Sequence, residues 1–281
     1  MTTTSDFTIR TMTRADLDIA IAWAKAEGWN PGLHDGDAFF ATDPKGYFLG
    51  EIGGEPISCI STVAYGSSFG FLGFYIVHPD FRGRGYGLQT WQHGMAYLGG
   101  RNVGLDGVTA QQENYVRSGF RLAYRNMRFE GVGGGETPQG LTPLSKLSFE
   151  QICDYDRPFF PADRAAFLRG WLRLPNSVGL GVVQGGELRG YGVLRPCVRG
   201  YKVAPLFADT PAIAEQIFQG LLGQVPGEPV FLDIPEPNVQ AVALVQSQGM
   251  QFVFETARMY TGTFPDLPLA RLFGVTTLEL G

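Results

Sequence analysis

Short runs in which apolar and polar residues alternate fill much of the first half of the chain, a pattern typical of half-buried strands. The runs cover residues 7–12, 47–52, 57–65 and 69–77. Gly53-Gly54-Glu55-Pro56 separates the second run from the third and predicts a hairpin. Thr13, followed three residues later by Asp16, forms a capping-box-like start, so a helix is expected from there toward Trp29, ended by the stretch 28–36.

Helical spacing of apolar residues follows the last of these runs. One helix face is expected to pack on the sheet and consists of Leu88, Trp91, Met95 and Leu98. Residues 103–108 are typical of a buried strand, a helix is expected around Tyr115, and residues 121–130 form a strand that closes the first unit. The predicted order of elements is therefore βαβββαβαβ.

A glycine-rich stretch then separates two halves that resemble each other. Residues 132–140 have the composition of a flexible linker. Beyond it, Gly185-Gly186-Glu187-Leu188 echoes the first hairpin sequence, and Gly249-Met250 echoes Gly119-Phe120 at nearly the same spacing. Strands are expected at residues 201–208 and 230–234. Two landmarks at nearly one offset predict an internal repeat.

Composition narrows the class of protein. The 281 residues, 44% hydrophobic and 17% charged, suit two globular domains. A net charge of −5 without a basic cluster argues against a nucleic-acid partner. Three scattered cysteines and three histidines predict neither a disulfide framework nor a metal site. The N-terminal sequence lacks the apolar core of a signal peptide and no run of 18 apolar residues occurs, so we expect a cytoplasmic protein without a membrane partner.

The stretch 77–87 carries the most specific chemistry. Arg82-x-x-Gly85-x-Gly87 follows an apolar strand and precedes a helix, so backbone N–H groups and the helix N-terminus can converge on an anion such as a pyrophosphate. The Lys-Ser/Thr ending of a nucleotide-triphosphate loop is absent, and the dinucleotide fingerprint would follow its strand directly. A glycine-rich turn without any ligand is the remaining alternative.

Two motifs together resemble the Gcn5-related N-acetyltransferase (GNAT) superfamily. Val77-x-Pro79 with Arg82-x-x-Gly85-x-Gly87 matches its acyl-CoA loop, and Tyr115 stands four residues before Gly119-Phe120, as the tyrosine that protonates the departing thiolate does in that family. A phenol of pKa near 10 can deliver a proton to a thiolate whose thiol has a pKa near 8.5. The resemblance implies Tyr115 as general acid.

The same resemblance implies an α/β (α+β) fold of two tandem acyl-CoA N-acyltransferase-like domains. Each would be a mixed, mostly antiparallel sheet with flanking helices and a splayed strand pair. Residues 1–131 would form the catalytic domain, 132–140 a linker and 141–281 a degenerate domain that shapes the substrate pocket. The second half retains Asn238 at a cofactor-contacting position, but Val245 stands where the tyrosine should be, and no glycine cradle follows residue 208.

The implied cofactor is acetyl-CoA, a cosubstrate, with no metal. Its binding residues would be Tyr75, Ile76, Val77, Arg82, Gly83, Arg84, Gly85, Tyr86, Gly87 and Leu88. The chain departs from the family where Val108 replaces an asparagine that contacts the pantetheine arm and Gln111 replaces a small residue. Asn114 or Gln112 could substitute for that asparagine.

The implied enzyme is an N-acetyltransferase acting on a primary amine of a small molecule, as a monomer or homodimer. The amine must lose a proton before it attacks. The candidate bases are His34, Asp35, Asp106, Asp233 and Glu236. The alternative for each is a turn residue or a solvated carboxylate. Trp29 and Asn30 lie where the family builds its acceptor site, and the strand 252–262 could turn Arg258 and Tyr260 toward an interdomain cleft. Two alternatives stay open: a CoA-binding sensory module, or a transferase of another acyl or aminoacyl group.

Overall fold

The first half follows the predicted order of elements, with one further helix. The computed structural model describes residues 6–281; residues 1–5, the start of the stretch examined for a signal peptide, lie outside the described residues. The elements are β1 (Phe7–Thr11), α1 (Arg14–Ala26), α2 (Asp35–Thr42), β2 (Tyr47–Ile52), β3 (Glu55–Tyr65), β4 (Phe69–Val77), α3 (Tyr86–Leu98), β5 (Asn102–Val108), α4 (Gln112–Arg117) and β6 (Arg121–Val132). The capping box at the start of α1 is present.

The helix α2 lies partly within the stretch expected to be a loop. Its N-cap, His34, makes no side-chain capping bond, so local sequence contributes little to its stability. Packing stabilises it instead, because Phe39 stacks on Trp171 of the second half with ring centroids 6.0 Å apart. The expected face of α3 also differs at one position, because Leu88 is 59% exposed instead of packed on the sheet.

The strands β4 and β5 part in the middle, as the fold class predicted. They pair in parallel only from Phe69 to Leu72 on β4. Beyond Leu72, neither Phe74 nor Tyr75 has a partner in the ladders to β3 or β5, and Phe74 has a φ of 45°. This bulge turns β4 away from β5 and opens a wedge between the two strands.

The second half repeats the first. Its elements are β7 (Leu141–Pro143), α5 (Phe149–Asp156), α6 (Ala165–Trp171), β8 (Val178–Gln184), β9 (Glu187–Pro196), β10 (Tyr201–Ala208), α7 (Pro211–Leu222), β11 (Pro229–Pro235), α8 (Val239–Ser247), β12 (Gln251–Tyr260) and β13 (Leu272–Gly274). The halves share apolar core, since one buried cluster includes Leu17 and Phe74 of the first half with Trp171 and Leu280 of the second. Among residues 6–281, no helix combines the length and apolar character needed to cross a membrane.

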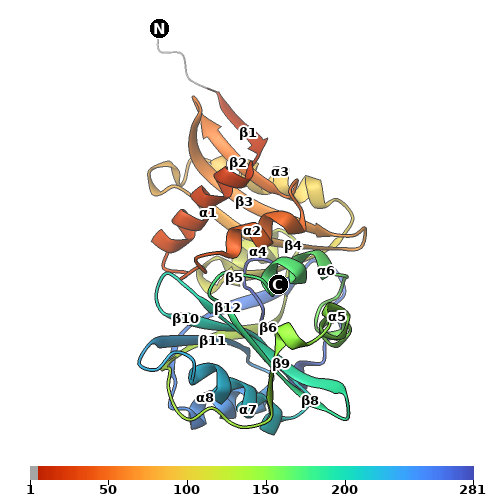
Figure 1. Cartoon of the computed structure of the whole chain (residues 1–281). Coiled ribbons are helices and arrows are strands. Elements are labelled where there is room, and N and C mark those ends of the chain that lie inside the picture. The colour runs from red at the N-terminus through yellow and green to blue at the C-terminus, as the bar shows by residue number, and fades with distance from the viewer. Residues whose placement is uncertain (1–5) are drawn as a thin grey trace.

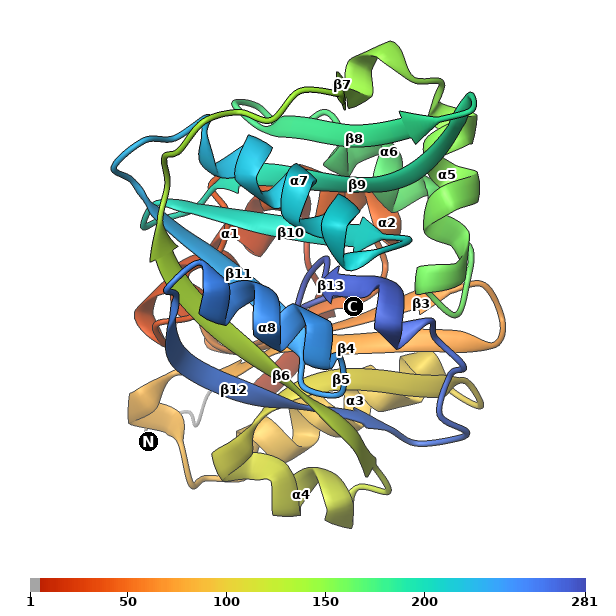
Figure 2. The same ribbon diagram turned by 90° about the horizontal axis from the view of Figure 1, so that it is seen from below.

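The halves exchange their last strands, which corrects the expectation that residues 121–130 close the first unit. The sheet runs β1-β2-β3-β4-β5-β12-β6-β11-β10-β9-β8-β7 in one continuous order. The strand β12 of the second half therefore pairs with β5, and β6 of the first half pairs with β11. Figure 2 shows β6 and β12 side by side between the two halves.

Matching ion pairs accompany the two exchanged strands. Arg258 on β12 faces Asp106 on β5, and Arg128 on β6 faces Asp233 on β11. In both pairs the guanidinium binds the carboxylate through two nitrogens, with distances of 2.6 to 2.9 Å. Both pairs are buried, so each exchanged strand meets a charge partner on the half that receives it.

The wedge of the second half is filled by the chain itself. The strands β10 and β11 pair in parallel from Tyr201 to Val203, and β13 then pairs with β10 at Leu206 and Phe207. The backbone N–H of Val275 donates to the carbonyl of Asp233 on β11, so β13 contacts both parted strands. From β13, residues 275–281 pass into the first half, between the two halves in Figure 1.

Candidate active site

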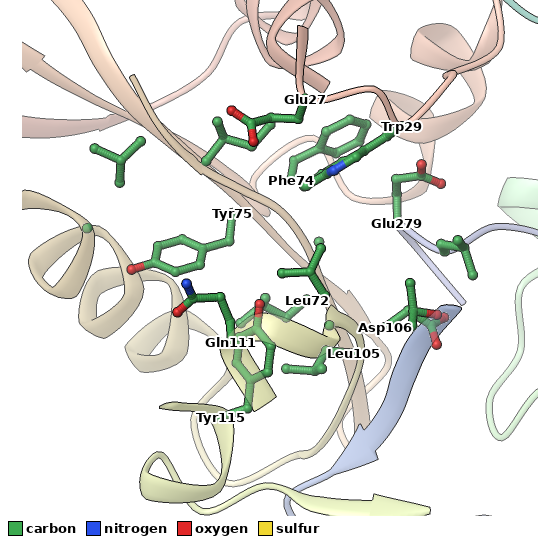
Figure 3. A pocket seen from close by; sticks show the side chains of 18 of the residues that line it. Glu27, Trp29, Leu72, Phe74, Tyr75, Leu105, Asp106, Gln111, Tyr115 and Glu279 are labelled. Atoms are coloured by element: carbon green, nitrogen blue, oxygen red, sulfur yellow. The ribbon is translucent and has the colours of Figure 1, made fainter. Parts of the chain in front are cut away.

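A cavity of about 470 Å³ opens where β4 and β5 part. Figure 3 shows part of its lining, including Tyr75 from β4, Asp106 from β5, Tyr115 from α4 and Glu279 from the segment 275–281. Both halves therefore build one cavity. It extends from the glycine-rich loop before α3 to β12 and the segment 275–281.

The predicted anion loop forms one end of this cavity. Gly83 and Gly85 have φ values of 74° and 84°, a left-handed conformation that favours glycine, and Gly85 is the N-cap of α3. The N–H groups of the first turn of α3 have no carbonyl partner within the helix and face an exposed loop. Adding a Cβ to Gly87 would bring it within 2.7 Å of the Tyr75 hydroxyl. The loop thus combines free backbone donors with room for a bound anion.

The cavity lining includes Tyr75, Ile76, Val77, Arg82, Gly83, Gly85, Gly87 and Leu88 of the predicted cofactor residues. Arg82 donates to the Val77 carbonyl at 2.9 Å and also pairs with Glu27, another lining residue. Arg84 stands outside the lining, with its guanidinium 5.4 Å from the ring centre of Phe81, and Tyr86 packs its ring on Phe7. Arg82 is therefore the arginine placed at the cavity.

Packing holds Tyr115 at the parted strands. Its ring stacks on Trp91 with centroids 5.7 Å apart, and a Cβ on Gly107 would lie 2.2 Å from the ring. The side chain is mostly buried but lines the cavity. Burial, with a smaller contribution from Tyr75, raises the pKa of Tyr115 to about 12, so the phenol keeps its proton at neutral pH.

Neither of the two residues suggested as substitutes for the family's asparagine lines the cavity. Val108 and Gln111 line the cavity, whereas Asn114 and Gln112 do not. Asn114 donates to the side-chain oxygen of Gln111 at 2.6 Å, and Gln112 accepts from Arg125. Gln111 is therefore the amide that faces the cavity (Figure 3).

Most of the carboxylates suggested as bases are engaged elsewhere. Asp106 lines the cavity, but Arg258 and Asn126 both donate hydrogen bonds to its carboxylate, and Arg258 also neutralises its charge. Burial would raise the pKa of Asp233, yet Arg128 and Lys202 hold it below its usual range. Asp35 pairs with Arg195 at 2.7 Å. These ion pairs leave Asp233 and Asp35 outside the cavity lining.

Three other predicted residues also lie apart from the lining. His34 is the N-cap of α2, and Glu236 is exposed after β11. Asn30 exchanges two hydrogen bonds with the backbone of Arg199, so it ties the two halves together. Trp29 does line the cavity. Arg128 donates to its backbone carbonyl at 2.7 Å and fixes its loop.

The sequence predicted that the second half shapes the pocket, but it did not identify the residues of that half that line the cavity. Phe254 and Thr256 of β12 line it, as do Leu278 and Glu279. No local motif marks these residues, because strand exchange brings β12 to β5. The alternation noted in residues 252–262 was the one available signal, although Arg258 meets Asp106 and Tyr260 packs in the core.

The second half offers no comparable site in the described residues. Its wedge holds β13, and Val245, at the tyrosine position, is buried in the core. Asn238 serves as the N-cap of α8, accepting from the N–H groups of Gln240 and Ala241. Its amide donates to the carbonyl of Leu272, the first residue of β13. The asparagine retained in the sequence therefore has a structural role.

Comparison with known proteins supports this description. A profile of the acetyltransferase (GNAT) family matches residues 15–120, and one of an acetyltransferase (GNAT) domain matches residues 152–274. Holothin acyltransferase from Pseudoalteromonas sp. (strain SANK 73390) is 31% identical over 269 residues, 95% of this chain and 92% of that protein.

Solved structures resemble the chain over both halves. A putative acetyltransferase from Pyrococcus horikoshii superposes with a TM-score of 0.85 at 21% identity, covering 98% of this chain and 96% of that one. A tandem GNAT protein from the clavulanic acid biosynthesis pathway gives a TM-score of 0.65 at 13% identity, covering 92% and 100%. The chain is an acyltransferase of the GNAT superfamily, in its two-domain form, and such proteins use an acyl-CoA cosubstrate.

Proposed function

We propose that this protein transfers an acetyl group from acetyl-CoA to a primary amine of a small molecule. The observation that carries the proposal is the single cavity that contains both the glycine-rich anion loop and the Tyr115 phenol. An acyl-CoA needs a pyrophosphate site at one end and chemistry at the thioester at the other. The parted strands β4 and β5 connect the two.

The proposed binding mode follows the cavity. The pyrophosphate lies on the N–H groups at the start of α3, beside Arg82. The pantetheine arm runs along Tyr75 to Val77 toward the bulge at Phe74, where unpaired backbone can reach the thioester oxygen. The amine attacks the thioester carbon, and Tyr115 protonates the sulfur as the C–S bond breaks.

A small acceptor agrees with the way the second half covers the cavity. Trp29, Phe254 and Leu278 give the far end an apolar wall contributed by both halves. The Pseudoalteromonas relative is named for acyl transfer to holothin. We propose residues 1–131 as the catalytic domain and 141–281 as the domain that shapes the acceptor end. A cytoplasmic location stays a prediction from the sequence.

Binding and turnover test the proposal. Isothermal titration with acetyl-CoA should give one site per chain, because β13 fills the second wedge. Release of CoA should then depend on an added amine. Binding without turnover across a broad amine panel would favour a sensory module, and a copurifying longer acyl-CoA or aminoacyl-tRNA would favour another transferase.

A further inference from the structure

Glu279 is a buried carboxylate that lines the cavity without a partner of its own. The residue is only 7% exposed and is one of those lining the cavity shown in Figure 3. Its side chain makes no hydrogen bond or ion pair with any other residue in the range 6–281. The buried aspartates differ, because each is paired with an arginine: Asp35, Asp106, Asp156 and Asp233. The Glu279 carboxylate therefore has no direct ion pair, so a cationic ligand can supply one.

The backbone around Glu279 is fixed against the bulge in β4. A Cβ on Gly73 would lie 2.2 Å from the Glu279 carbonyl oxygen, so these two backbones are in close contact. The Leu280 N–H donates to the Thr277 hydroxyl at 2.8 Å, and the Tyr65 hydroxyl donates to the Leu280 carbonyl at 3.0 Å. The backbone of Glu279 is therefore held beside the strand segment where the thioester is expected.

The buried charges near Glu279 include more cations than anions. Arg128, Arg195 and Lys202 form a buried cluster with only two aspartates, Asp35 and Asp233. Without Glu279 the cluster has one cation in excess. The charge of Glu279 acts on this cluster. Burial raises the pKa of Asp35, Arg195 opposes that rise, and the nearby charge of Glu279 raises the pKa further.

A second unpartnered polar group accompanies Glu279 in the cavity. The hydroxyl of Thr256 is buried and has no hydrogen-bond partner among the described residues. A carboxylate, a free hydroxyl and the indole of Trp29 are the groups that would receive an alkylammonium. Resting on the proposed function, we infer that Glu279 binds the ammonium of the acceptor and is the catalytic base that removes its proton.

The step balances as follows. The ammonium gives one proton to Glu279, and the neutral nitrogen bonds to the thioester carbon. The C–S bond breaks, and Tyr115 gives its proton to the sulfur. The second proton lost from nitrogen returns to Tyr115 through solvent, and Glu279 releases its own proton. The products are the amide, CoA thiol and one proton.

The test compares Glu279→Gln with the wild type and with Glu228→Gln, an exposed glutamate in a turn of the same half. Acceptors are 2-phenylethylamine, tryptamine and spermidine, which are ammonium ions at neutral pH, and aniline, which is neutral there. For the alkylamines, Glu279→Gln should lower kcat/KM by about 10²-fold or more, as loss of a general base does. For aniline the loss should be much smaller, and Glu228→Gln should match the wild type.

The ratio between alkylamine and aniline rates is read within one variant, so partial misfolding cannot produce the expected change. Glu279→Asp, which keeps the charge on a shorter arm, should recover part of the alkylamine rate. Equal losses for both amine types would overturn the role of base. So would a wild type that acetylates aniline but none of the alkylamines. Failure of the proposed function itself would look different, as absent acetyl-CoA binding or a Tyr115→Phe variant of unchanged rate.

Discussion

Arg128 and Asp233 face each other across the ladder between β6 and β11 and form a buried ion pair through two nitrogen–oxygen contacts of 2.6 and 2.7 Å. A third nitrogen of Arg128 holds the backbone of Trp29. One guanidinium thus connects the exchanged strand, the half that receives it and the Trp29 loop at the cavity.

Replacing Asp233 by Asn should destabilise the protein by about 3–5 kcal/mol at neutral pH, because Arg128 and Lys202 would lose their buried partner. The folded pKa of Asp233 is depressed, so its stabilisation is complete above its unfolded value, near 3.9, and is lost as the pH falls below that value. Urea unfolding at neutral pH and near pH 3 measures the free energy of unfolding of variant and wild type. The difference between the two free energies should be smaller at pH 3.

An exposed aspartate supplies the control for this variant. Asp154 pairs with Arg157 at 3.3 Å, and both side chains are about two-thirds exposed. Asp154→Asn should change stability by less than about 1 kcal/mol at either pH. A difference between Asp233→Asn and wild type that stays constant into acid would contradict the assignment of the ion pair.

Gly73→Ala should separate the segment 275–281 from β4. A Cβ there would overlap the Glu279 carbonyl oxygen, and overpacking of this kind typically costs about 1–3 kcal/mol. We expect kcat/KM for the amine to fall by about tenfold or more, since 1.4 kcal/mol at the reacting groups corresponds to tenfold.

Gly190→Ala is the matched control for Gly73→Ala. Gly190 is also a strand glycine whose Cβ would clash, with Ile213 at 2.7 Å, but it lies in the second half away from the cavity. The Gly190→Ala variant should be less stable than the wild type. At a temperature where it remains folded, its kcat/KM should stay near that of the wild type. Equal loss of activity in both variants would argue that Gly73 acts through stability alone.

Gly85→Ala tests the anion loop. Gly85 and Gly66 both have positive φ and open space at the Cβ position, so either substitution costs about 1–2 kcal/mol of backbone strain. Only Gly85→Ala should also weaken acetyl-CoA binding, by about tenfold or more, because strain at the N-cap moves the donors of α3. Titration calorimetry on both variants provides the measurement, and equal affinities would contradict this placement of the pyrophosphate.

Local sequence was sufficient for the cofactor end of the cavity. The loop at 82–87 is encoded by glycines that permit left-handed backbone at Gly83 and Gly85, and the position of Tyr115 follows from helical spacing before Gly119. The alternating runs likewise predicted the strands, whereas the parting of β4 from β5 was implied by the family resemblance. Each of these features depends on residues that are close together in the chain, so it can be predicted from local sequence.

The acceptor end depends on contacts between residues far apart in the chain. Packing across the whole sheet decides whether β6 or β12 pairs with β5. The two strands have similar sequence patterns, so their local sequences do not distinguish the two pairings. Asp106 and Asp233 look like free carboxylates until the exchange places an arginine opposite each of them. Glu279 carries no motif, and only the path of residues 275–281 brings it to the cavity.

The most direct test of the account is the rate of acetyl transfer in Tyr115→Phe. Tyr97→Phe is the control, because its hydroxyl also lies in the first half but bonds to Asp43, away from the cavity. With acetyl-CoA binding confirmed by calorimetry in each protein, Tyr115→Phe should lower kcat by about 10²–10⁴-fold, while Tyr97→Phe should keep it. A Tyr115→Phe variant that binds acetyl-CoA and turns over at the wild-type rate would contradict the account.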